Sequence, residues 1–358
     1  MLIERKQDLP KAGAWAAFGG TLVTAAAVAL TLGAGPALAG SDDGFCSATA
    51  LAQLGACKSE VVDDAFIAKA ICLNISNRGE RRQCSREAEA ATEEANVLCR
   101  EQYAARRDLC SEIGENRYDP DFGPANFDDP RNPSNPNPYF PLAVGNLWEF
   151  EAGAETVTIK VLDKTKFIDG VNCIVVNDVV EEDGKLVEDT DDWFGHRKDG
   201  TIDYCGERVQ DFEFFEGDDP AEAELTSIDG TFKAGVDGSK PGTLFPGTPE
   251  VGAVYRQEWS PGNAEDAARV LSTDYGFGND SELDEHVPQE LVELLCNDDC
   301  VVTAEFSPLS PGGLEHKYFA RGIGKFLEVN VESGKVSQLV GCNFDPRCDD
   351  LPEPGGNE

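Results

Sequence analysis

Six cysteines in the first third of the chain constrain its fold more than any other feature. Their spacings read the same in both directions, at 11, 15, 12, 15 and 11 residues, and each pair taken from the outside inwards has positions that sum to 156. Equal sums are expected for two antiparallel segments joined by a turn near residue 78, where Asn77-Arg78-Gly79 favours a turn. Steps of 11 and 15 residues rotate a helix by about 20° and 60° beyond whole turns, so the cysteines of each arm share a face. The sequence therefore predicts a disulfide-stapled helical hairpin over 40–118, with the pairs Cys46–Cys110, Cys57–Cys99 and Cys72–Cys84.

A zinc site is the alternative use of these cysteines. Paired zinc ligands usually lie only a few residues apart, and no histidine is near this segment. All twelve cysteines follow residue 45, and an even number in an exported chain is typical of disulfides. We therefore interpret them as a covalent framework.

The N-terminal segment is typical of a bacterial signal peptide. Three basic residues precede an apolar stretch over 14–39, which ends in Ala37-Leu38-Ala39 before Gly40. An uncleaved anchor is the alternative, because the stretch approaches the length that spans a bilayer, although its glycines and proline weaken a stable span. We predict that residues 1–39 are cleaved, that no membrane span follows them, and that the protein is periplasmic or secreted.

The pattern changes twice beyond residue 118. Six prolines alternate with asparagine and aspartate over 119–138, which predicts an extended, unpacked linker. Short β-branched and aromatic runs follow, separated by Asp-Gly pairs that are typical of hairpins. Strands are expected at 147–150, 156–162, 173–176, 179–180, 202–205, 212–215, 225–233, 253–260, 268–274, 300–306, 315–321, 324–331 and 335–341, with one helix at 287–296. The fold class is therefore α+β: the hairpin, then a mainly antiparallel barrel-like or sandwich domain over 139–345, and a flexible tail at 346–358.

Six further cysteines lie beyond the hairpin, and their order predicts local bridges. The expected pairs are Cys173–Cys205, Cys296–Cys300 and Cys342–Cys348. A crossed pairing of Cys296 and Cys300 with Cys342 and Cys348 stays open from the sequence alone.

Four motifs in the β-domain resemble a family of exported bacterial β-rich proteins. They are Tyr139-Phe140-Pro141-Leu142 with Gly145-Asn146-Leu147-Trp148, the stretch 235–242, Gln257-Glu258-Trp259 with 262–266, and the stretch 315–324. The motifs cover roughly 139–340 and leave the hairpin outside the resemblance. The family is uncharacterised, so the resemblance implies an exported β-rich domain and no particular activity.

The β-domain holds most of the protein's acidity. It has 15 basic against 43 acidic residues, in a chain whose formal net charge is -37. This charge argues against nucleic-acid binding and against adhesion to anionic membranes. Carboxylates in loops are ligands for Ca²⁺, the candidate cofactor, although no EF-hand spacing is present and a solvated acidic surface explains the same residues. The preferred metal ligands are Asp189, Asp191 and Asp192, or Asp280, Glu282 and Asp284.

Signals for catalysis are weak. The chain has no nucleophile elbow, zinc-protease motif, phosphate-binding loop or dinucleotide-binding glycine pattern, and its three histidines are far apart. Carboxylates combined with a histidine and an arginine could bind a cation or a small polar ligand. The preferred residues for such a site are Asp237, Glu258, Glu265, Asp266, His316 and Arg321.

These observations predict a non-catalytic binding or interaction protein of the cell envelope, whose partner is a protein or glycan of the envelope. The alternative is an envelope hydrolase that acts on polysaccharide or ester through paired carboxylates. A third interpretation is an anionic spacer that displays the hairpin.

Overall fold

The computed structural model describes residues 44–355 and divides them into two compact units. Unit 1 comprises residues up to 100 together with 114–117, and unit 2 comprises 101–113 and the chain from 118 onwards. The expected signal peptide, 1–39, lies outside the described residues.

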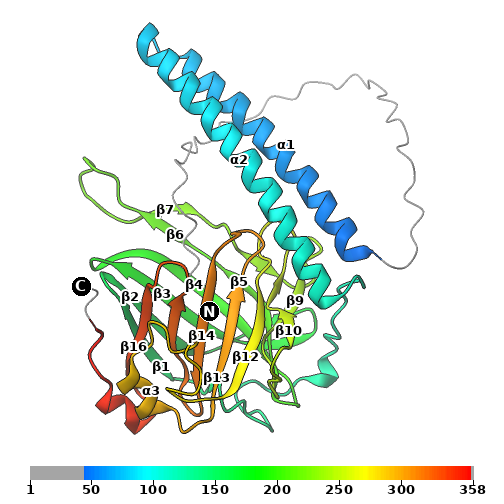
Figure 1. Cartoon of the computed structure of the whole chain (residues 1–358), viewed down its shortest axis with the longest axis vertical. Coiled ribbons are helices and arrows are strands. Elements are labelled where there is room, and N and C mark those ends of the chain that lie inside the picture. Colours follow the sequence, from blue (N-terminus) through cyan, green and yellow to red (C-terminus); the bar gives the residue numbers. More distant parts are fainter. Residues whose placement is uncertain (1–43, 356–358) are drawn as a thin grey trace. The chain divides into compact units, whose positions relative to one another are not determined.

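Unit 1 is a hairpin of two antiparallel helices (Figure 1). Helix α1 is Phe45–Leu73 and helix α2 is Arg78–Ile113, whose residues from 101 onwards belong to unit 2. The turn forms where it is predicted: the Asn77 side chain accepts a hydrogen bond from the Gly79 N–H at 2.7 Å and so caps the start of α2. The predicted fold class, a disulfide-joined helical hairpin followed by an antiparallel barrel-like sheet, is confirmed.

The hairpin is stabilised by disulfide bonds and has only a small hydrophobic core. Cys57–Cys99 and Cys72–Cys84 join the helices at Cα–Cα distances of 5.8 and 5.6 Å, as the palindromic spacing predicts, and Cys46 and Cys110 are disulfide-bonded as well. On α1 the buried side chains are Ala50, Val61 and Cys72, which are 11 residues apart and therefore lie on one face. Such a narrow interface needs covalent staples to be stable. Within 44–355, no helix combines the length and the apolar character needed to cross a bilayer.

Unit 2 is a sixteen-stranded antiparallel sheet. The strands run up and down in sequence order from β12 to β16, β16 pairs with β1, and β1 to β5 continue the sheet to β9 and β11. The strands are β1 Leu147–Ala152, β2 Glu155–Ile168, β3 Val171–Glu182, β4 Lys185–His196, β5 Ile202–Arg208, β6 Asp211–Glu213, β7 Glu224–Ser227, β8 Phe232–Lys233, β9 Lys240–Phe245, β10 Val254–Arg256, β11 Glu258–Trp259, β12 Ala267–Tyr275, β13 Cys300–Phe306, β14 Leu314–Ala320, β15 Gly324–Asn330 and β16 Val336–Cys342.

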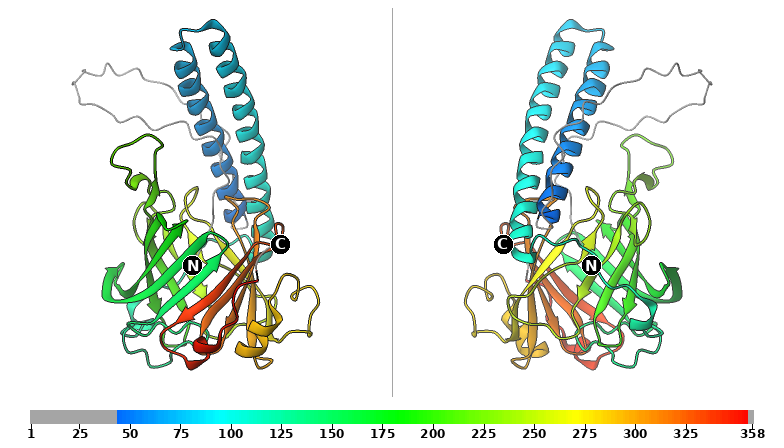
Figure 2. Two further views of the ribbon diagram at one scale, coloured as in Figure 1. Left: turned by 90° about the vertical axis from the view of Figure 1, so that its left-hand side faces the viewer. Right: turned by 90° about the vertical axis from the view of Figure 1, so that its right-hand side faces the viewer.

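The sheet curls into a nearly closed barrel (Figure 2). The two ends of the strand order, β10 and β11, are consecutive in the chain and are separated only by Gln257. The Gln257 N–H donates to the carbonyl of Asp266 at 2.8 Å, while β11 pairs with β9 on the other side. At Gly242 of β9, a Cβ atom would lie 2.0 Å from the Gln257 carbonyl oxygen, so the closure requires glycine there.

The short helix α3, Gln289–Leu295, lies in the connection between β12 and β13. Leu291, Val292 and Leu295 of this helix are buried, and the hydroxyl of Tyr318 donates to the Leu283 carbonyl at 2.7 Å. The predicted helix at 287–296 is therefore present.

Several predictions made for unit 2 need correction. Strand β4 is not among the predicted strands, because Glu188, Thr190 and Asp192 occupy positions that are apolar in an ordinary barrel. Strand β9 is also missing from them, because its Pro-Gly pair is typical of a turn.

The three local disulfides of unit 2 are the predicted ones. They are Cys173–Cys205, Cys296–Cys300 and Cys342–Cys348, so the crossed alternative is excluded.

The proline-rich segment 119–138 is extended but not unpacked. Phe122 and Phe127 are buried in a cluster with Trp193 and the Cys173–Cys205 disulfide, because their rings cover the outside of the barrel there. The tail also starts later than predicted: Cys348 is buried in a short 3₁₀ helix over Pro346–Asp350, and the Gln338 side chain donates to the Pro352 carbonyl at 2.8 Å. Residues 356–358 lie outside the described residues.

Candidate functional site

The inner face of the barrel is identified by aromatic rings that meet across it. Phe245 of β9 and Phe319 of β14 have ring centroids 4.7 Å apart, although their strands are not neighbours in the sheet. Phe194 of β4 joins them through Phe140, with centroid distances of 5.9 Å to Phe194 and 6.4 Å to Phe319. Side chains two residues away on the same strand share this face. Lys317 and Asp192 therefore point into the barrel beside Phe319 and Phe194.

One end of this inner face is lined by charged side chains instead of rings. Residues directly opposite each other in antiparallel strands project to the same side, and the register places Asp192 opposite Glu207, Lys317 opposite Glu328, and Glu305 opposite Glu315. We call the nine carboxylates of this region the acidic interior: Asp178, Glu188, Asp192, Glu207, Glu258, Asp266, Glu305, Glu315 and Glu328.

The carboxyl groups of Asp192 and Glu207 both contact the hydroxyl of Tyr204. The Tyr204 hydroxyl donates to an Asp192 oxygen, and its oxygen lies 3.1 Å from Glu207 Oε2, where a protonated Glu207 can donate. Burial raises the pKa of Asp192 to about 6, and burial together with the Asp192 charge raises the pKa of Glu207 well above its usual value. Because the two carboxyl groups repel, they release their protons in separate steps.

Asp178 is buried among the other carboxylates of the acidic interior. Its side chain is 5% exposed, and Oδ1 has no hydrogen-bond partner among the described residues. Burial and the neighbouring charges of Asp192 and Glu188 raise its pKa well above the usual range. Further polar atoms in the described barrel are likewise buried without a hydrogen-bond partner, among them Gln257 Oε1, the Tyr255 hydroxyl and Ser337 Oγ. Buried groups of this kind are normally satisfied, so they mark a place where a polar ligand, ion or water can bind.

Lys317 balances part of this charge. Its side chain is 1% exposed, and its Nζ lies 2.9 Å from Glu305, 3.6 Å from Glu328 and 3.8 Å from Glu315. Burial alone would raise the pKa of Glu305, but the ammonium group of Lys317 holds it below the usual value. Burial and the Glu328 charge raise the pKa of Glu315 to about 8. Lys317 and its neighbour Lys325 are therefore outnumbered by the carboxylates around them.

The six predicted ligand-binding residues do not form one site. Glu258 and Asp266 belong to the acidic interior: the charge of Glu258 raises the pKa of Tyr204, after the larger effect of burial, and Asp266 adds in the same way to that of Glu207. The remaining four lie elsewhere. Asp237 is in an exposed turn, Glu265 forms a buried two-bond ion pair with Arg106 at 2.7 and 3.0 Å, His316 is on the opposite face of β14 from Lys317, and Arg321 is paired with Asp299 at 3.4 Å.

The predicted metal ligands are also separated. Asp189 to Asp192 lie in strand β4 and not in a loop, so alternation sends Asp192 inwards while Asp189 accepts from Asn177 at 2.7 Å and Asp191 pairs with Arg208 at 2.8 Å. In the second set, Asp280 accepts from the Glu282 N–H and Asp284 accepts from Tyr275. No group of three or more His, Cys, Asp or Glu within 44–355 is arranged to hold a metal ion.

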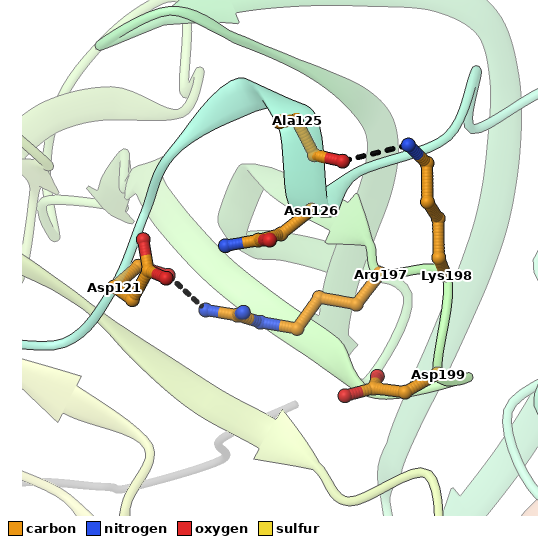
Figure 3. Close-up of a pocket in the computed structure, with 6 residues that line it drawn as sticks. All are labelled: Asp121, Ala125, Asn126, Arg197, Lys198 and Asp199. Carbon is orange, nitrogen blue, oxygen red and sulfur yellow. Dashed lines mark hydrogen bonds between the residues drawn. The ribbon is translucent and has the colours of Figure 1, made fainter.

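A shallow surface pocket lies between the segment 121–126 and the β4–β5 turn (Figure 3). Its two cations point at the backbone of that segment: Arg197 donates to the Asp121 carbonyl at 2.5 Å and Lys198 to the Ala125 carbonyl at 2.6 Å. Arg197 also pairs with Asp203 at 2.7 Å. These bonds attach the segment to the barrel, which gives the pocket a structural role.

Several residues of the acidic interior are absent from the predicted site. Their contacts Tyr204 and Lys317 are absent from it as well. The signal that could have found these residues is charge or polarity at every second strand position, as in Glu315-x-Lys317 and Glu188-x-Thr190-x-Asp192. The missing carboxylates are Asp178, Glu188, Glu207, Glu305, Glu315 and Glu328. No protein-family model, curated protein or solved structure matches the chain.

Proposed function

We propose that the protein is a non-catalytic binding protein of the cell envelope whose barrel interior takes a cationic ligand, specifically an organic amine. The observation that carries the proposal is the buried, unpartnered carboxylate oxygen of Asp178 among an excess of inward-facing acids. An ammonium group that reaches Asp178 would donate a charge-assisted hydrogen bond to this buried oxygen.

Two features favour an amine. The carboxylates are spread over strands β3, β4, β5, β13 and β15, which suits an extended molecule with more than one positive centre. The aromatic rings of Phe194 and Tyr204, 5.1 Å apart, lie next to Asp192 on the inner face, and such rings attract cations and pack against methylene groups. The disulfide framework supports an oxidising compartment outside the cytosol, as the expected signal peptide does.

The test is thermal unfolding of the purified protein with spermidine, Ca²⁺, Mg²⁺ or NaCl at matched ionic strength. Spermidine is expected to raise the melting temperature by about 5 °C or more at saturation, since a ligand that binds only the folded state stabilises it by about 2.7 kcal/mol at 100 times its Kd. Asp178→Asn should abolish the rise. Asp163→Asn, at an exposed carboxylate on the outside of β2, should leave it unchanged.

The outcomes separate the possible causes. A rise with spermidine that depends on Asp178 supports the proposal. A rise with Ca²⁺ alone would replace the amine with a metal ion, and an equal response to every salt would show charge screening; both overturn the proposal.

A hydrolase that acts on polysaccharide or ester is a second candidate, favoured by the Asp192–Tyr204–Glu207 arrangement. Two carboxyl groups whose protons leave at different pH can serve as acid and base. We expect that, if this candidate holds, the protein hydrolyses p-nitrophenyl glycosides or acetate and Glu207→Gln reduces the rate at least 100-fold. An absence of turnover in the unaltered protein, or an equal rate in Glu207→Gln, would eliminate it.

A further inference from the structure

Helix α1 carries an exposed stripe that is separate from the barrel and from the face buried within the hairpin. The stripe lies within an arc of about 80° and is centred about 100° around the helix from Ala50, Val61 and Cys72. Its four large apolar side chains are 51% (Leu51), 55% (Val62), 66% (Phe66) and 66% (Leu73) exposed. We define the stripe as the part of this arc from Leu51 to Leu73, beyond which only the small Ala48 continues it towards the start of α1; its members are Leu51, Gly55, Lys58, Val62, Phe66, Lys69 and Leu73.

The stripe is symmetric about Val62. Each pair of members taken from the outside inwards has positions that sum to 124, so Leu51 corresponds to Leu73, Gly55 to Lys69 and Lys58 to Phe66. If a second α1 is laid antiparallel along it, every member meets its counterpart: leucine meets leucine, Val62 meets Val62, and each Lys58 meets the ring of a Phe66. The last contact is a cation–π pair. A surface with this property is complementary to itself.

Gly55 supports the same arrangement. A glycine inside a helix destabilises it by about 1 kcal/mol relative to alanine, and a Cβ atom placed at Gly55 would contact nothing within 4 Å. The intrahelical packing therefore does not require glycine. In the antiparallel pair, the missing side chain leaves room for the long side chain of Lys69.

Charge opposes self-association less at the hairpin than at the β-domain. The hairpin segment 40–118 has 10 basic and 14 acidic residues, whereas the β-domain has 15 and 43. Two copies approaching through their β-domains would repel, and two copies approaching through their hairpins would do so far less. Exposed apolar side chains also occur on the other flank of α1, at Ile67 and Ile71, but there they lie among the exposed carboxylates of Glu60 and Asp64, which makes that flank less suited to an apolar interface.

We propose that the stripe is a homodimer interface, in which two copies of the protein pair α1 against α1 in antiparallel orientation about a two-fold axis at Val62. Because the interface consists of one helix face from each copy, it is at the small end of protein interfaces, and a dissociation constant in the micromolar range is expected.

Engineered cysteines test the geometry in the full-length protein. Val62→Cys lies on the axis and is expected to form a covalent dimer under mild oxidation. Leu51→Cys alone should form none, but a mixture of Leu51→Cys and Leu73→Cys should form a heterodimer. Ile71→Cys, about 180° around the helix from Val62, is the control and should stay monomeric.

Sedimentation equilibrium from 1 μM to 1 mM provides the second measurement. Val62→Glu is expected to weaken dimerisation at least tenfold, because it places two carboxylates face to face, while Ile71→Glu should leave it unchanged. Both positions are exposed, so neither variant should alter folding. A protein that stays monomeric to 1 mM, or that cross-links as well through Ile71→Cys as through Val62→Cys, would overturn the proposal.

Discussion

Replacing Lys317 by methionine is expected to lower the free energy of unfolding by about 3–5 kcal/mol at pH 7, because it leaves buried carboxylates without their counter-charge. Lys317 is 1% exposed and contacts Glu305 at 2.9 Å and Glu328 at 3.6 Å. The loss should shrink at pH 4.5, where the carboxyl groups can take up protons. Urea unfolding monitored by tryptophan fluorescence at both pH values gives the measurement.

The matched control is Lys335→Met. Lys335 pairs with Glu155 at 3.3 Å, but its own side chain is 45% exposed, so about 0–1 kcal/mol is expected. The double variant Lys317→Met/Glu305→Gln should regain at least half of the loss, and it keeps the test valid if the single variant is too unstable to purify. A loss from Lys317→Met no larger than that from Lys335→Met would contradict a buried charge network.

The protein is also expected to become more stable on acidification from pH 8 to pH 5, by about 3 kcal/mol or more. Burial raises the pKa of Glu188 to about 7, of Asp266 to about 6 and of Glu315 to about 8. Unfolded carboxyl groups titrate near 4, so between pH 4 and 8 the folded state binds more protons than the unfolded state. Stability contributed by these groups is present at low pH and lost as the pH rises through 6 to 8.

Glu305 and Glu328 act in the opposite direction. Burial alone would raise both pKa values, but Lys317 lowers that of Glu305, and Lys325 and Lys317 lower that of Glu328 to about 2. Their stabilisation is present above about pH 4.3 and is lost as the pH falls towards 2. The maximum of stability is therefore expected near pH 4–5.

Unfolding free energies at pH 4.5, 6, 7 and 8, measured at 0.2 M salt to hold charge screening constant, will show the slope. Glu188→Gln should flatten the slope between pH 6 and 8, and Asp163→Asn should not. A free energy that is constant or rises from pH 5 to 8 would refute the raised pKa values.

The helical hairpin was predictable because its information is local and redundant. The cysteine spacing, the Asn77 turn and the helical periodicity all indicate the same antiparallel pair of helices. The disulfide bonds are compatible with only one register between these helices. Most strands of the barrel were predictable for a similar reason, since β-branched runs alternate with Asp-Gly turns. Closure was not, because it depends on Gln257 joining two strands that belong to opposite ends of the sheet.

The candidate site was less predictable because its strands place charged residues at the inward positions, where strands are usually recognised by apolar residues. A strand whose inward positions are Glu188, Thr190 and Asp192 has the composition of a loop, which is why the sequence predicts metal ligation by Asp189, Asp191 and Asp192 there. Lys317 illustrates the same limit: in sequence it is one charge between His316 and Tyr318, and only the register with Glu305 and Glu328 shows that it is enclosed. Contacts between strands that are far apart in the sequence leave no pattern in the sequence of either strand.

The pairing of β1 with β16 determines the order in which the barrel can be completed. Trp148 lies opposite Cys342, 194 positions later in the chain. At a synthesis rate of about 5–20 residues per second, the first strand waits about 10–40 s for this neighbour. During that time one edge of β1 is open to other chains. The nascent protein is therefore most prone to aggregate just before its last strand emerges, and truncations that remove residues 336–342 are the ones that leave this edge permanently open.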